Sequence, residues 1–265
     1  MVDLDTGQIT PLPASIATAG SYYAVSPDRT MVAYSSCCSP PDPLFVANID
    51  GTGVRQISAK GQDVYGAQWS PDGSMLVYQQ RDGSTQTLGN LFVQDVATGQ
   101  RTQITNFDQS QSWDWWFTFP SFAPDRPYVF FQLPRGVPTD PVWDLWCVSQ
   151  TGGTPILVRR DAGWGGLGAG LLFNLAYLSP ISKDDFTGGG LWIDSFDERA
   201  VIPRGLFPPG HLTWLRWSPG GKRISYADRG SIYVLDVTTD KIRRVAKGGT
   251  AEWFNDHTLI VGPGG

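Results

Sequence analysis

Short runs of alternating apolar and polar residues recur along the chain and predict β-strands. Examples are residues 75–78 (Met-Leu-Val-Tyr), 91–96 (Leu-Phe-Val-Gln-Asp-Val) and 231–236 (Ser-Ile-Tyr-Val-Leu-Asp). Alternation with a period of two is typical of a strand that buries one face, and turn-forming residues separate the runs. The pattern therefore predicts an all-β protein built from many short strands.

A turn of the Ser-Pro-Asp-Gly type recurs after the first strand of a repeating unit. Its copies lie at residues 26–29, 70–73, 123–126 and 218–221, with a degenerate copy at 254–257. Proline sets φ at the first central position, aspartate bonds to the nearby backbone, and glycine takes a positive φ. Tryptophan precedes three of these copies, at positions 69, 217 and 253, and we expect these rings in the core.

A second kind of turn, such as Asp-Gly-Thr-Gly at residues 50–53, gives the period of the repeat. One reference residue marks each of its six copies: Gly7, Gly53, Gly99, Gly152, Glu198 and Asp240. Successive reference residues are 46, 46, 53, 46 and 42 positions apart. Four short antiparallel strands in about 40 to 50 residues are typical of a β-propeller blade. Six marks therefore predict six blades.

The chain starts and ends in the middle of a unit, which predicts closure of the ring. Residues 1–5 and 8–12 have the pattern of a third and a fourth strand, and residues 250–254 and 258–261 that of a first and a second. We expect residues of about 250–265 and 1–13 to share one blade, which removes open sheet edges. The predicted fold is one domain, residues 1–265: a six-bladed β-propeller of four-stranded antiparallel blades, closed by strands from both termini.

The fourth unit departs from the repeat, because its first turn is rich in glycine and lacks Ser-Pro-Asp. We expect its strands near residues 163–168, 171–178, 190–195 and 199–203.

One stretch carries a family resemblance. Residues 69–78 (Trp-Ser-Pro-Asp-Gly-Ser-Met-Leu-Val-Tyr), followed by 91–95 and 103–105, resemble the TolB-like propeller repeat, also called the WD40-like PD40 repeat. Five of the six units are recognisable, although the Gly-His and Trp-Asp dipeptides of WD40 repeats are missing from their places. The resemblance implies the propeller fold, a protein or peptide partner, and a periplasmic or extracellular location.

Composition and charge narrow the function classes. The 265 residues include 31 Gly, 20 Pro, 11 Trp, 9 Tyr and 13 Phe, a mixture that favours strands and turns over a helical bundle. A net charge of −5 argues against a nucleic-acid partner, which needs a basic footprint. The longest apolar run, residues 171–178, is too short for a membrane span of about 20 residues. Residues 1–5 have neither the basic nor the apolar region of a signal peptide, so we expect none there.

The long loops are predicted on one face of the propeller, here called the long-loop face. That face carries the connections from strand four to the next blade and from strand two to strand three, at residues 37–43, 80–90, 106–116, 133–144, 161–163, 179–189 and 204–211. Recognition usually occurs on such loops, and we expect function there.

The segment Trp113-Asp114-Trp115-Trp116 lies before the first strand of the third blade, close to the channel mouth. One interpretation is an aromatic platform for a peptide, a sugar or a protein. The other is packing between blades. Trp143 and Trp164 lie in or beside the same loops, and with Trp115 and Trp116 they would form an aromatic ring around the mouth.

Polar residues directly precede the aromatic residue of several first strands and are expected to line the channel. They are Gln68, Ser121, Arg216 and Glu252. Arg216 and Glu252 belong to adjacent units, so we expect them to pair. The pair is either a structural ion pair or part of a channel site for a small anion or metal.

No motif for catalysis is found. His211 and His257 are the two histidines, which excludes a three-histidine metal centre, and H-E-x-x-H, G-x-S-x-G and C-x-x-C are absent. Residues 163–168 match G-x-G-x-x-G, but a strand-like run follows where a helix is needed. We expect no catalytic residue, metal or cofactor, and free thiols at Cys37, Cys38 and Cys147.

The predicted function is a non-catalytic propeller scaffold that binds a protein or peptide on its long-loop face. A carbohydrate-binding or carbohydrate-active propeller is one alternative. A structural module of a larger secreted protein is another.

Overall fold

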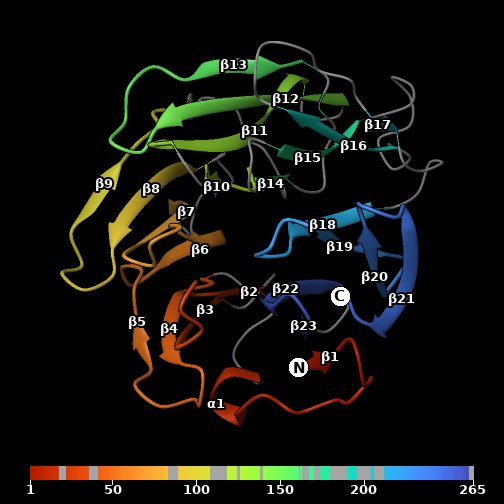
Figure 1. The fold of residues 1–265 in the computed structure, drawn as a ribbon. Coiled ribbons are helices and arrows are strands. Elements are labelled where there is room, and N and C mark those ends of the chain that lie inside the picture. The colour runs from red at the N-terminus through yellow and green to blue at the C-terminus, as the bar shows by residue number, and fades with distance from the viewer. Residues whose placement is uncertain are drawn as a thin grey trace.

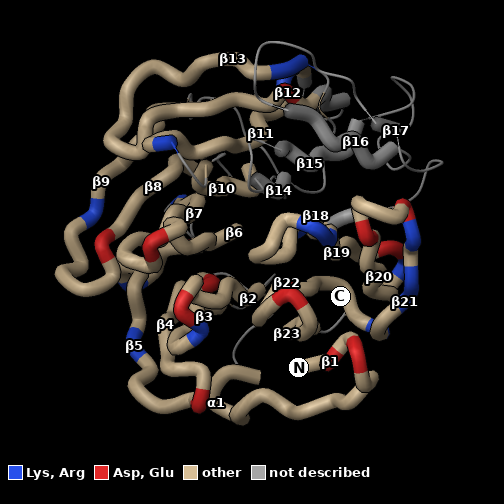
Figure 2. Tube along the Cα trace, in the orientation of Figure 1, with Lys and Arg blue, Asp and Glu red and all other residues tan. Residues whose placement is uncertain are grey.

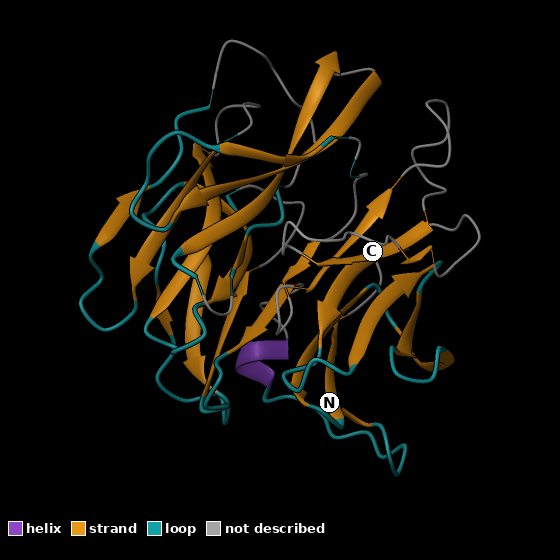
Figure 3. Ribbon diagram, turned by 45° about the horizontal axis from the view of Figure 1, so that its top comes forward, coloured by secondary structure: helices purple, strands orange, loops and turns teal. Residues whose placement is uncertain are grey.

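The structure is a computed structural model. It describes residues 1–17, 22–35, 41–82, 89–107, 118–123, 126–137, 140–160, 162, 167–169, 174–179, 190–195, 204–205 and 212–262. Strands dominate these ranges, and α1 (Ala14–Ala17) is the one helix among them (Figure 3). The all-β prediction is confirmed for this part of the chain.

Five antiparallel sheets have four strands each, paired in sequence order (Figure 1). The first blade is β2 (Tyr22–Val25), β3 (Met31–Ser35), β4 (Leu44–Asn48) and β5 (Arg55–Gln56). The second is β6 (Gln62–Trp69), β7 (Met75–Asp82), β8 (Asn90–Asp95) and β9 (Arg101–Gln103). The third is β10 (Ser121–Phe122), β11 (Tyr128–Val137), β12 (Asp140–Ser149) and β13 (Ile156–Arg159).

The fourth and fifth blades complete this set. The fourth is β14 (Leu167–Ala169), β15 (Asn174–Ser179), β16 (Gly190–Ser195) and β17 (Arg204–Gly205). The fifth is β18 (Leu212–Trp217), β19 (Arg223–Asp228), β20 (Ser231–Asp236) and β21 (Lys241–Lys247). In the fourth blade the third strand lies where the sequence predicts it, whereas the other three lie a few residues later in the chain.

The two termini meet in a further sheet, here called the closing sheet. It contains β1 (Val2–Asp3), β22 (Thr250–Asn255) and β23 (Thr258–Gly262), in the order β1-β23-β22. Val2 pairs with Leu259 and Asp3 with Thr258, so the predicted joining of the termini is confirmed.

The predicted count of six four-stranded blades is wrong, because five blades have four strands and the closing sheet has three. Residues 8–12, expected as a fourth strand, contribute the single bridge between Val2 and Ile9. Pro11 and Pro13 explain the difference, since neither has an amide N–H to donate to a ladder.

The first strands of the sheets form a ring. β2 contacts β6, β6 contacts β10, β10 contacts β14, β14 contacts β18, β18 contacts β22, and β22 contacts β2 (Figure 1). The closing sheet therefore lies between the fifth and the first blade. Two loops predicted on the long-loop face are shorter than expected, because β7 extends to Asp82 and the pair β11–β12 spans most of residues 133–144.

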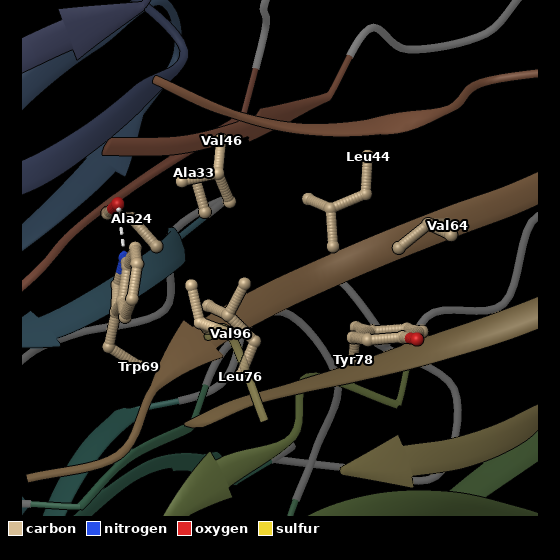
Figure 4. Packing of buried hydrophobic residues seen from close by; sticks show 9 residues of the cluster. All are labelled: Ala24, Ala33, Leu44, Val46, Val64, Trp69, Leu76, Tyr78 and Val96. Carbon is tan, nitrogen blue, oxygen red and sulfur yellow. Dashed lines mark hydrogen bonds between the residues drawn. The ribbon is translucent and has the colours of Figure 1, made fainter. Parts of the chain in front are cut away.

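The hydrophobic core lies between neighbouring blades. Val46 of the first blade and Leu76 of the second belong to one buried cluster with Trp69 (Figure 4). The Trp69 Nε1 donates a hydrogen bond of 2.8 Å to the carbonyl oxygen of Ala24 in the preceding blade. Trp253 repeats this contact, with Nε1 3.0 Å from the Arg216 carbonyl oxygen. The core positions predicted for Trp69 and Trp253 are confirmed.

The Ser-Pro-Asp turns owe their shape to one carboxylate. Asp72 Oδ1 accepts hydrogen bonds from the Ser70 hydroxyl at 2.6 Å and from the Ser74 amide and hydroxyl at 3.0 and 2.8 Å. The Ser70 hydroxyl in turn accepts from the Met75 amide at 2.9 Å, and Gly73 has a φ of 74°. This turn, and its copy at Ser26 and Asp28, thus fix the start of the second strand through their own side chains.

The aspartate carboxyl groups of the turns are expected to make the protein less stable in acid. Hydrogen bonds from neighbouring hydroxyl groups lower the pKa of Asp28 and Asp72 in the Ser-Pro-Asp turns, and of Asp236 in a turn of the second kind, below the ordinary 3.8. A carboxyl whose pKa is lower in the folded state stabilises the fold above its unfolded value, and this contribution is lost as the pH falls through the lowered pKa. We expect the melting temperature to fall as the pH drops below about 4.

The matched variant is Asp28→Asn/Asp72→Asn/Asp236→Asn, which keeps an acceptor oxygen in each turn but removes the titration. Thermal unfolding of both proteins between pH 6 and 2.5 should show a shallower pH dependence in the variant. An equal slope would contradict the assignment of acid sensitivity to these turns.

Candidate functional site

Three first-strand segments share an uncommon backbone conformation. Gly66, Phe119 and Trp214 have φ values of 63°, 45° and 57°. Each lies two residues before a polar residue expected in the channel, and β6 and β18 shift register at this place. Glycine adopts positive φ freely, whereas bulky residues do so rarely, and such strained positions concentrate at functional sites. Phe119 and Trp214 are therefore candidates for function.

Phe119 and Trp214 meet Tyr22 in a group that we call the axial aromatic cluster. The ring centroid of Trp214 lies 4.7 Å from that of Tyr22 and 5.4 Å from that of Phe119, the latter edge-on at 84°. Tyr22 belongs to the first blade, Phe119 precedes the third, and Trp214 belongs to the fifth. Residues of three non-adjacent blades can meet only near the central axis of the ring.

The cluster lies toward the long-loop face. Tyr22 begins β2 and pairs with Ser35, the last residue of β3, at the end where strands two and three are connected. Trp214 and Tyr22 are partly exposed, and Phe119 is buried. Two of the three rings therefore retain accessible surface.

Below the aromatic cluster lies the predicted ion pair. Arg216 Nε is 3.0 Å from Glu252 Oε2, and the two side chains are 10% and 14% exposed. Arg216 Nη1 also donates to the Leu215 carbonyl at 2.9 Å, and its guanidinium lies 5.5 Å from the Trp214 ring centroid. The prediction that Arg216 and Glu252 pair is confirmed, and the pair supports Trp214 through a cation–π contact.

Burial has the largest effect on the pKa of Glu252. Loss of solvent raises the pKa of its carboxyl, and the Arg216 guanidinium opposes this shift. The Gln68 amide faces the same carboxylate from β6, but its Nε2 has no acceptor within hydrogen-bond distance among the described residues. A polar layer from three sheets thus lies beneath the aromatic rings.

A second ion pair lies at the long-loop end of the second blade. Arg81 Nε is 3.2 Å from Oδ2 of Asp63, which is fully buried, and Arg81 Nη2 donates to the Tyr65 hydroxyl at 3.2 Å. The other Asp63 oxygen accepts from the Asp42 amide at 2.9 Å. Burial raises the pKa of both Tyr65 and Tyr22 to about 12, so both phenols keep their protons at neutral pH.

Of the aromatic residues predicted at the channel mouth, the structure describes Trp143 alone. Trp113, Asp114, Trp115, Trp116 and Trp164 lie outside the described residues, so the platform predicted from them stays a prediction. Trp143 is 2% exposed in β12, and its carbonyl oxygen accepts from the Ala162 amide at 2.7 Å. The loop position expected for Trp143 is therefore wrong, because the β11–β12 hairpin extends through the region expected as a loop. Its role in binding stays a prediction.

Sequence reasoning missed Tyr22, Phe119 and Trp214. One signal was present: aligned copies of the repeat place Gly66, Phe119 and Trp214 at the same position. A position that takes glycine in one copy favours a left-handed backbone in the others. The contacts among three separate blades had no signal in the repeat.

The described part of the chain has neither a metal-binding cluster nor a membrane-spanning helix. No group of three or more His, Cys, Asp or Glu side chains there is placed to hold a metal ion. No helix in those residues is long and apolar enough to span a membrane. Cys147 is a free, buried thiol, as predicted, and burial raises its pKa. Cys37 and Cys38 lie outside the described residues.

Comparisons with known sequences give partial matches. No family model matches the chain. Dipeptidyl-peptidase 5 of Porphyromonas gingivalis is 29% identical over 136 residues, which are 46% of this chain and 19% of that protein. The Tol-Pal system protein TolB of Polaromonas sp. is 31% identical over 83 residues, 31% of this chain and 19% of that protein. The chain thus matches about a fifth of the length of each relative.

Comparisons with solved structures confirm the fold. TolB from Acinetobacter baumannii has a TM-score of 0.63 at 17% identity, covering 89% of this chain and 55% of that one. A gluconolactonase from Xanthomonas campestris has a TM-score of 0.66 at 13% identity, covering 94% and 85%. An oligogalacturonate lyase in complex with manganese has 0.61 at 19%, covering 100% and 77%.

This chain has a TolB-like β-propeller fold. At these identities the likeness concerns the fold alone, and proteins named as enzymes share it. The fold therefore does not decide between binding and catalysis, and the residues of the site must carry that argument.

Proposed function

We propose that this chain is a non-catalytic binding propeller, which holds an extended segment of a protein partner at the axial aromatic cluster. The observation that carries the proposal is the meeting of Tyr22, Phe119 and Trp214 from three blades. Aromatic side chains held by a rigid scaffold offer large contact area with little loss of conformational entropy, and they dominate the energetics of protein interfaces.

Accessible aromatic surface supports a peptide ligand. Tyr22 and Trp214 are partly exposed beside the buried ring of Phe119, so an extended segment can pack against them. Arg216 and Glu252 lie deeper and hold Trp214 in place. We also infer a periplasmic or extracellular setting from the TolB-like repeat, and we infer that the closing sheet serves as a sixth, three-stranded blade, since it contacts both neighbours.

The test is capture of partners from an extract of the source organism by wild type and by Trp214→Ala. We expect the variant to lose the captured protein, with at least a 30-fold weaker Kd, because truncation of a central aromatic residue removes about 2 kcal/mol or more. Mass spectrometry identifies the protein, and calorimetry measures its affinity.

Two variants serve as controls. Ile156→Ala removes an exposed apolar side chain on the outer strand β13, away from the cluster, and should bind like wild type. Trp214→Phe keeps a ring and should retain most of the affinity. Equal capture by wild type and a folded Trp214→Ala protein would contradict the proposal.

A carbohydrate ligand is the second candidate, because the partly exposed rings of Tyr22 and Trp214 lie side by side, as sugar stacking requires. A soluble oligosaccharide that changes the tryptophan fluorescence of wild type, and not of Trp214→Phe/Tyr22→Ala, would favour it over a protein. A chain with neither ligand would be a structural module of a larger secreted protein.

A further inference from the structure

The outer strand of the fifth blade differs from the other outer strands. β21 has seven residues, whereas β5, β9, β13 and β17 have two, three, four and two. Its sequence, Lys-Ile-Arg-Arg-Val-Ala-Lys, holds four cations in a chain with a net charge of −5. These cations are Lys241, Arg243, Arg244 and Lys247, and all four are exposed.

The cations of β21 have no partners within the described chain. None of the four forms an ion pair or a side-chain hydrogen bond with a described residue. Outer-strand arginines elsewhere are engaged: Arg55 Nη2 donates to the Val96 carbonyl at 2.6 Å, and Arg101 Nη1 donates to Gln80 Oε1 at 2.8 Å. The positive charge of β21 is therefore available to another molecule.

The edge of β21 is also open. Among the described residues it is the last strand of its sheet and pairs with β20 alone. The neighbouring closing sheet has three described strands, and none of them pairs with β21. Figure 2 shows the blue segments of β21 along the outer rim of the ring. An open edge of this length is a template for another strand.

The cations lie on both faces of the strand. Lys241 pairs across from Asp236 and Arg243 from Val234, which places them on one face. Arg244 pairs across from Tyr233 and Lys247 from Ser231, after a register shift, which places them on the other. A strand added to this edge would meet two positive charges on each side.

We propose that β21 docks an extended, acidic segment of a partner protein, which adds to the fifth blade as a further strand. Main-chain hydrogen bonds along the edge position the segment, and carboxylates on both of its faces pair with the four cations. Opposite charges across adjacent strands stabilise such pairing. This surface lies on the rim, so it acts independently of the axial aromatic cluster.

The test uses the full chain and a fluorescein-labelled peptide that repeats Glu-Glu-Val-Val, which places carboxylates on both faces of an added strand. A second peptide of equal charge carries proline in place of every second valine, which prevents strand pairing. Fluorescence anisotropy should show binding of the first peptide, with a Kd at least tenfold lower than that of the proline peptide. Hydrogen exchange at the β21 amides should slow when the first peptide is bound.

The matched variants are Arg243→Glu/Arg244→Glu and Lys60→Glu/Lys222→Glu, which make the same charge change at exposed positions. The first should weaken peptide binding at least tenfold, and the second should leave it within about twofold. Equal binding of both peptides, or equal effects of both variants, would overturn strand addition. Absence of binding would also overturn it and would leave the cations as protection against pairing between copies.

Discussion

Replacement of Trp253 by alanine is expected to lower the free energy of unfolding by about 3–5 kcal/mol. The side chain is 3% exposed and packs against Ile232 and Val234 of the fifth blade. Its removal opens a cavity between this blade and the closing sheet. It also leaves the Arg216 carbonyl without the indole donor at 3.0 Å. Urea unfolding at neutral pH, followed by circular dichroism, measures the loss.

Two further variants divide this effect into its parts. Trp253→Phe keeps an aromatic ring but removes the donor, and should cost about 1–2 kcal/mol. Ile9→Ala changes a residue that is 73% exposed in the terminal segment, and should stay within about 0.5 kcal/mol of wild type. A Trp253→Ala protein as stable as the Ile9→Ala protein would contradict the packing of the closing sheet against the fifth blade.

Most of the fold could be predicted from the repeat, because the geometry of a Ser-Pro-Asp turn depends on its own few residues. Ser70, Asp72 and Ser74 form a closed set of hydrogen bonds within five residues, so the local sequence alone determines where a second strand begins. The same holds for Ser26 and Asp28. A regular spacing of such turns therefore predicts the strand order and the pairing within each blade.

The closing sheet shows where a hydrophobic pattern is insufficient. Residues 8–12 alternate as a strand does, but Pro11 and Pro13 remove donors and Ile9 remains exposed. The predicted loop lengths are wrong for another reason. The β11–β12 hairpin continues past the expected strand ends because pairing partners are available on both sides, which the individual runs do not reveal.

The candidate site was predictable only where the repeat placed its residues. Arg216 and Glu252 hold equivalent positions in neighbouring sheets, so their contact follows from the period. Tyr22, Phe119 and Trp214 meet across the axis from non-adjacent blades, and this depends on the closure of the whole ring. Periodicity along the chain contains no information about such a distance.

Removal of one partner of the Arg216–Glu252 pair is the second large effect expected. Arg216→Met leaves the Glu252 carboxylate buried without its cation, and the free energy of unfolding at pH 7 should fall by about 3–5 kcal/mol. The pair is 3.0 Å apart, and both side chains are at least 85% shielded from solvent. The effect should exceed that of an exposed ion pair, which contributes about 1 kcal/mol or less.

The stability of Arg216→Met should change with pH in a definite direction. Burial already raises the pKa of Glu252, and without Arg216 the largest influence that opposes this shift is lost. A carboxyl whose pKa is raised on folding is stabilising below its unfolded value of about 4.5, and this stabilisation is lost as the pH rises through the folded pKa. Arg216→Met should therefore be closest to wild type in mild acid and should lose stability toward pH 8.

The double variant Arg216→Met/Glu252→Leu completes the cycle. It removes both charges together, so most of the stability lost in Arg216→Met should return, and the additional pH dependence should disappear. Urea unfolding of the four proteins at several pH values measures the coupling. If Arg216→Met shows no steeper pH dependence than wild type, Glu252 is not the buried charge that responds. If the double variant is as unstable as Arg216→Met, shape rather than charge explains the effect, because the methionine would then fail to fill the space below Trp214.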